Sequence, residues 1–383
     1  MSLFVRAERR PLAALLLALC AVAIAGAGCD TAADVPLAEG ASLRIVRYGD
    51  APQPATRSDY ARFGVVMAAG DIHLFDPGTG PERPPRFVRR LETTGLLATS
   101  AQVDANGFVW LAAPDRFSGN ARSVNRALYV IDPHAANVVR RIELPGSLTS
   151  VGDVLVSGDW VYLYAWRNGF SAGIGRVAKA CATDAARCEA TLFTELGDVG
   201  AGIERPMHRW GPWLYVVAAR SSRSPADSLF KIDAQSGVVK ERSVDVGRFA
   251  FDGEALFLGP APSHTALLRV TKEGLRQTAS APTMADVLAV DAGRLYMSNR
   301  DHDWFEVRET TTLALVSSGK RPGGMGSDAF GFVAPGMLML DGVTTLDVRT
   351  GTLYQDPASA EVLAGFDGDW SAPMLPEGHA YAY

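Results

Sequence analysis

One strand–turn–strand phrase recurs along this sequence and constrains its fold more than any other feature. Two alternating apolar residues precede a turn anchored by Asp, and another alternating strand follows. The clearest copies are HLFDPGTG at 73–80, LYVIDPHAANVVRRIEL at 128–144 and LFKIDAQSGVVKERSV at 229–244, with weaker copies at 267–278, 305–316 and 345–354. Gly follows Asp by four residues in Asp76–Gly80, Asp233–Gly237 and Asp347–Gly351. Asp accepts hydrogen bonds from turn N–H groups and Gly takes positive φ, so each copy predicts a hairpin.

A second sequence pattern recurs at a similar spacing, and it places a turn residue before a strand rich in aromatic and β-branched residues. Its copies lie at 106–113, 158–166, 211–219, 252–259, 292–299 and 335–342. Short strands at this spacing, with no long helical pattern after residue 28, predict an all-β chain. A four-stranded unit repeated about every 40–50 residues is typical of a β-propeller blade.

Counting the hairpin anchors gives the number of blades. With Cys181 as one substitute anchor, the turns lie near residues 76, 132, 181, 233, 271, 308 and 347. We therefore predict a single seven-bladed β-propeller over residues 41–357, with every anchor at a third-to-fourth strand turn. The segment 41–49 is a candidate strand for the last blade, where it would close the ring. Residues 29–40 are expected to be a flexible tether, and residues 358–383 a tail that packs on the propeller.

The Asp-turn-Gly hairpins resemble those of bacterial propellers with YVTN-like or PQQ-like repeats. The resemblance covers about residues 60–357 and is one of pattern. It implies an exported propeller with a ligand site around the central channel. The signatures of quinoprotein, WD, kelch and sialidase repeats are absent from the sequence, so no subfamily is assigned.

The first 28 residues have the form of an export signal. Three arginines precede an apolar run over residues 12–24, which is short for a membrane span. Gly26-Ala27-Gly28-Cys29 resembles a bacterial lipobox, so Cys29 is expected to become the lipidated first residue. Cleavage after Ala27, followed by plain secretion, is the alternative. The location predicted is therefore a lipoprotein that faces the periplasm or the cell surface.

Two cysteines remain in the body of the chain, Cys181 and Cys188. In an oxidising compartment such a pair predicts a disulfide. A metal site would need two further soft ligands, and neither a CxxC motif nor a nearby His supplies them. The bridge is expected to be a structural staple across one hairpin.

Charge and composition narrow the set of partners. Without residues 1–28, which carry three Arg and one Glu, the net charge changes from −5 to about −7. This acidic balance argues against a nucleic-acid partner or an anionic membrane surface. The expected partner is a protein, peptide or glycan of the envelope, with the membrane reached only through the lipid anchor. We expect a monomer without metal or cofactor.

In a propeller, the second-to-third strand links and the links between blades open on one face. These links are long and Arg-rich in the early blades, and loops on a rigid scaffold often carry function. The segment ERPMHRW at 204–210 places charged residues where an inner strand is expected. The candidate ligand-binding residues at this channel mouth are Arg116, Arg167, Glu204, Arg205, His208, Arg220 and Asp301.

Three other features have simpler interpretations. GFSAG at 169–173 matches the elbow of serine hydrolases around Ser171, but a β-like segment follows it instead of a helix. DHD at 301–303 offers metal-ligand atoms, yet strand alternation would send His302 away from both aspartates. The aromatic residues that recur once per blade are interpreted as packing, with a carbohydrate platform as the alternative.

Three functions fit the sequence. A non-catalytic binding or scaffold protein is favoured. A propeller enzyme of the lactonase or lyase kind would need acid and amide groups that converge on the axis from several blades, and no such repeated placement is seen. A purely structural component of an envelope complex is the third. Catalysis is left open and no catalytic residue is assigned.

Overall fold

The computed structural model describes most of the chain from residue 42 onward. The described residues are 42–68, 71–79, 82–94, 100–112, 127–148, 150–167, 171–197, 199, 202–218, 228–244, 246, 249–259, 266–283, 285, 287–299, 304–320, 331–340, 344–355, 375 and 377. Within these ranges no helix is long and apolar enough to cross a membrane.

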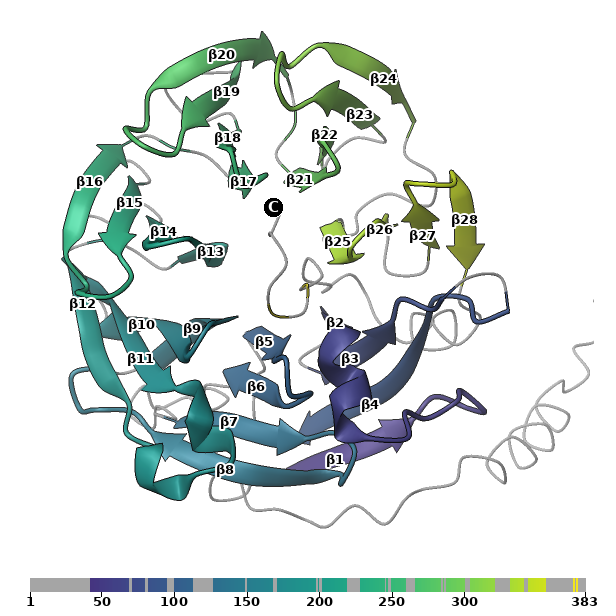
Figure 1. The fold of residues 1–383 in the computed structure, drawn as a ribbon, viewed down its shortest axis with the longest axis vertical. Coiled ribbons are helices and arrows are strands. Elements are labelled where there is room, and N and C mark those ends of the chain that lie inside the picture. The colour runs from purple at the N-terminus through teal and green to yellow at the C-terminus, as the bar shows by residue number, and fades with distance from the viewer. Residues whose placement is uncertain are drawn as a thin grey trace, which may run out of the picture.

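Seven four-stranded antiparallel sheets stand around one axis, which confirms the predicted seven-bladed β-propeller (Figure 1). Blade 1 consists of β2 (Gly64–Ala68), β3 (Asp71–Asp76), β4 (Arg86–Thr94) and β1 (Ser42–Arg47). Blade 2 consists of β5 (Ser100–Val103), β6 (Val109–Ala112), β7 (Ala127–Asp132) and β8 (Asn137–Glu143). Blade 3 consists of β9 (Ser150–Ser157), β10 (Trp160–Arg167), β11 (Ser171–Ala178) and β12 (Thr191–Gly197).

Blades 4 to 7 follow the same plan, with the first-named strand of each next to the axis. They consist of β13 (Gly202–Trp210), β14 (Trp213–Ala218), β15 (Ser228–Asp233) and β16 (Val239–Val244); β17 (Phe249–Phe251), β18 (Ala255–Leu258), β19 (Ala266–Thr271) and β20 (Gln277–Pro282); β21 (Val287–Asp291), β22 (Arg294–Asn299), β23 (Trp304–Glu309) and β24 (Leu315–Gly319); and β25 (Gly331–Ala334), β26 (Met337–Met339), β27 (Thr344–Asp347) and β28 (Thr352–Gln355).

Turn chemistry explains why the hairpins lie where the repeats predicted them. Six of the seven anchors lie at or beside a third-to-fourth strand turn, as predicted. In blade 4 the Asp233 carboxylate accepts hydrogen bonds from the N–H groups of Gln235 and Ser236, and Gly237 has a φ of 76°. We call the face that carries these turns and the first-to-second strand turns the turn face, and the opposite face the link face.

The first blade departs from the prediction in two ways. β1 pairs with β4 as the outermost strand of blade 1, so the expectation that segment 41–49 completes the last blade is wrong. Blade 7 takes all four of its strands from residues 331–355. Since β1 supplies the outer strand, Asp76 at the end of β3 precedes the second-to-third strand turn, and its assignment to a third-to-fourth turn is also wrong.

Asp76 nevertheless lies on the turn face, because the inner strand of blade 1 runs in the opposite direction. The 3-10 helix η1 (Arg57–Arg62) leads into β2. At its start Arg57 binds Asp132 at 3.1 Å, and at its end Arg62 binds Asp76 at 3.1 Å. β2 therefore starts on the face where β5 ends. The repeat pattern therefore predicted the correct face of the propeller for Asp76 but the wrong position of its strand within the blade.

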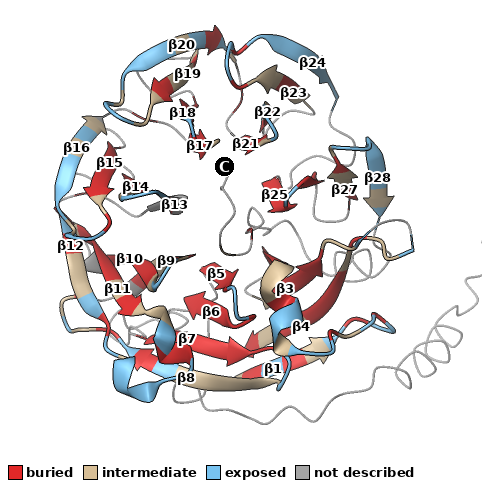
Figure 2. Cartoon of the chain, viewed as in Figure 1, coloured by how far each residue is buried: buried red, intermediate tan, exposed pale blue. Residues whose placement is uncertain are grey.

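Close packing joins the last blade to the first. A Cβ atom added to Gly64 at the start of β2 would lie 1.9 Å from the carbonyl oxygen of Val333 in β25. The described side chains of the inner strands other than β13 are mostly buried, and the outer strands β16, β20, β24 and β28 are largely exposed (Figure 2). The core therefore lies between the blades and close to the axis.

Candidate functional site

The predicted link-face site falls mostly beyond what the structure describes. Arg116, Arg220 and Asp301 lie outside the described residues. Arg167 ends β10 at the link face, and Glu204 and Arg205 belong to β13. Since β13 is the innermost strand of blade 4 (Figure 1), the expectation that residues 204–209 occupy an inner strand is correct for the backbone.

His208 is the one predicted ligand residue whose side chain is described, and it is buried. Its exposed fraction is 3%. The imidazole centre lies 4.5 Å from the ring centre of Phe251 on β17 of the next blade, and His208 faces Tyr215 across the strand pair. Burial lowers the pKa of His208 to about 3. The residue is therefore neutral near pH 7 and packs between blades 4 and 5.

The recurring aromatic residues pack between blades, as interpreted from the sequence. None of them is more than 7% exposed, which rules out a carbohydrate platform on Trp110, Tyr162, Tyr215, Phe257 and Tyr296. The Tyr162 hydroxyl donates to the Ala234 carbonyl of blade 4 at 3.2 Å. Likewise the Tyr215 hydroxyl donates to the Lys272 carbonyl of blade 5 at 2.8 Å. These residues hold adjacent blades in register.

Two acidic side chains on the turn face, those of Asp104 and Asp252, hold the turns in which they lie. Both oxygens of Asp104 are used: one accepts from the N–H groups of Asn106 and Phe108, the other from the Trp110 indole N–H at 2.9 Å. Burial raises the pKa of Asp104. Asp252 caps its own turn in the same way. Among the residues described, no group of three metal-ligating side chains occurs.

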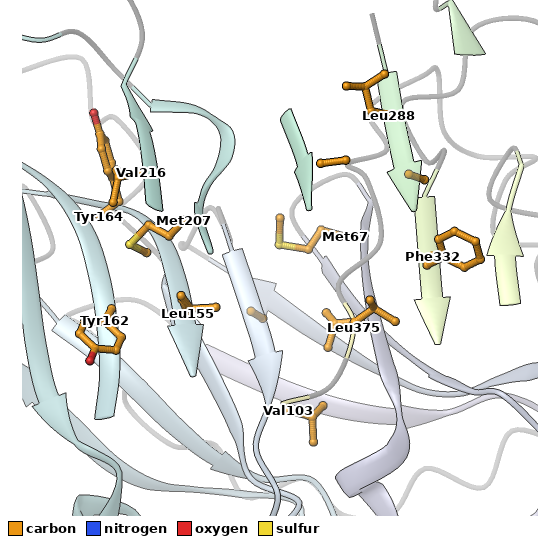
Figure 3. Packing of buried hydrophobic residues seen from close by; sticks show 14 of the residues in the cluster. Met67, Val103, Leu155, Tyr162, Tyr164, Met207, Val216, Leu288, Phe332 and Leu375 are labelled. Carbon is orange, nitrogen blue, oxygen red and sulfur yellow. The ribbon is translucent and has the colours of Figure 1, made fainter. Parts of the chain in front are cut away.

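A cavity of about 340 Å³ opens at the turn-face end of the axis. Its walls are the first-to-second strand turns of blades 5, 6 and 7 and the side chain of Leu375. Leu375 is 4% exposed and belongs to the same apolar cluster as Met67, Val103 and Phe332 (Figure 3). A residue close to the C-terminus therefore lies among the inner strands.

The segment that contains Leu375 is held on the turn face by main-chain and side-chain bonds. The Gln102 side-chain amide donates to the Leu375 carbonyl at 3.2 Å, and the Glu377 N–H donates to the Val103 carbonyl at 3.0 Å. The Glu377 carboxylate accepts from Lys179 at 2.7 Å and from the Ala105 N–H at 2.8 Å. The two charged side chains are only 18% and 7% exposed.

A second cavity, of about 540 Å³, borders Lys179 between blades 2 and 3. Asn106, Trp160 and Arg187 are among its lining residues. Sequence reasoning missed Lys179, Leu375 and Glu377 as candidates. The tail carries no repeat, and Lys179 and Glu377 lie 198 residues apart, so no local pattern pointed to their contact.

The disulfide lies beside this second cavity. Cys181 and Cys188 are bonded, with their Cα atoms 4.7 Å apart, as predicted. Their loop contains the 3-10 helices η2 (Lys179–Ala182) and η3 (Ala185–Arg187) between β11 and β12. Lys179 is thus fixed two residues from the bridge.

Ser171 does not sit on a hydrolase elbow. It is the first residue of β11, an eight-residue strand, whereas the elbow needs a helix after the serine. Ser171 therefore lies in a strand, and its match to the G-x-S-x-G motif does not form the elbow of a serine hydrolase.

No protein-family model matches the sequence, and no curated protein matches it. Solved structures do resemble the fold. The dihydro-heme d1 dehydrogenase NirN in complex with DHE has a TM-score of 0.50 at 10% identity, over 79% of this chain and 74% of that chain. BamB from Moraxella catarrhalis has a TM-score of 0.48 at 12% identity, over 87% of this chain and 90% of that one. A chain of the Mitotic Checkpoint Complex has a TM-score of 0.49 at 11% identity, covering 81% and 92%. The likeness to NirN shows a shared fold alone.

Proposed function

We propose that this protein is an exported, lipid-anchored β-propeller of the cell envelope that binds a protein, peptide or glycan without catalysing a reaction. The signal-like N-terminus and Cys29 support the location. The Cys181–Cys188 disulfide is consistent with it, because such bonds persist in oxidising compartments. The hairpin pattern supports a relationship to the YVTN-like or PQQ-like propellers.

The observation that carries the proposal is the position of β13. This strand lines the axis and starts at the link face, and it carries Glu204 and Arg205 near that end. Arg167 ends β10 at the same face. Guanidinium groups offer paired donors that suit carboxylate and phosphate groups. The proposed ligand therefore presents acidic groups to an Arg-rich rim on the link face.

Capture from envelope extracts tests the binding role. The mature protein is used as bait, and bound proteins and glycans are identified by mass spectrometry. The double variant Arg205→Ala/Arg220→Ala should lose most of the partner while its melting temperature stays within a few degrees of the wild type. A matched control is Arg141→Ala/Arg276→Ala, which removes two exposed arginines from the blades. Equal capture by both double variants would rule out the rim.

Metabolic labelling with a palmitate analogue tests the anchor. Label should be incorporated into the wild type and lost in Cys29→Ala. A mature protein that begins at Gly28, or label that persists in the variant, would establish ordinary secretion or another modification site.

A further inference from the structure

No further inference is drawn: the strongest candidate, the surface patch at the turn-face end of blade 4 where Trp210, Val238 and Val239 expose apolar side chains, carries nothing, because no feature of the described residues shows what covers it.

Discussion

Titration of His208 should control the acid stability of this propeller. The unfolded chain protonates this histidine with a pKa of about 6.5, whereas burial in the folded chain lowers the pKa to about 3. Between those values the unfolded state binds more protons, so stability falls as the pH falls below 6.5. Linkage gives a loss of about 2 kcal/mol in the free energy of unfolding at pH 5 relative to pH 8.

Urea unfolding at pH 8 and pH 5 measures that loss. His208→Leu removes the titration, so its stability difference between the two pH values should be about 2 kcal/mol smaller than that of the wild type. Other titrating groups are common to both proteins and cancel in the comparison. Leu353→Ser, at an exposed position of β28, removes no titrating group and should leave the difference unchanged. Equal pH dependence in the wild type and His208→Leu would refute the burial argument.

Three further predictions concern stability, each measured by urea unfolding at pH 7. Replacing Cys181 and Cys188 by Ala should cost about 2–3 kcal/mol, because the bridge closes an eight-residue loop; equal midpoints with and without reductant would contradict a structural role. Gly64→Ala should cost about 1–3 kcal/mol through its contact with the Val333 carbonyl, and an unchanged midpoint would show that the blade 7–blade 1 contact is loose. Asp104→Ala should cost about 2–3 kcal/mol, since it leaves the buried Trp110 N–H without its acceptor; a loss below 0.5 kcal/mol would be inconsistent with that bond.

The placement of the predicted site residues shows the limit of a repeat pattern. A sequence repeat predicts which residues occupy equivalent strands in successive blades. That prediction was correct for β13, which is an inner strand. The repeat does not state which face of the strand packs against the next blade. His208 looked like a polar residue of the channel, yet it stacks on Phe251 of blade 5. That contact depends on the rotation of one blade against another, which involves residues 43 positions apart.

Local chemistry is what the sequence determined by itself. Alternating strands, Asp caps and positive-φ glycines act within about ten residues, so the turns, the all-β class, the seven blades and the disulfide could be predicted. Tertiary structure decided which edge each strand joins. β1 carries the same alternating pattern whether it pairs with β4 or with the last blade, and only packing around the closed ring distinguishes the two. The Lys179–Glu377 pair likewise joins residues 198 positions apart. The strength of this ion pair depends on burial, which arises only when blades 2 and 3 and the C-terminal residues have come together. The sequence alone therefore did not indicate that the two residues are in contact.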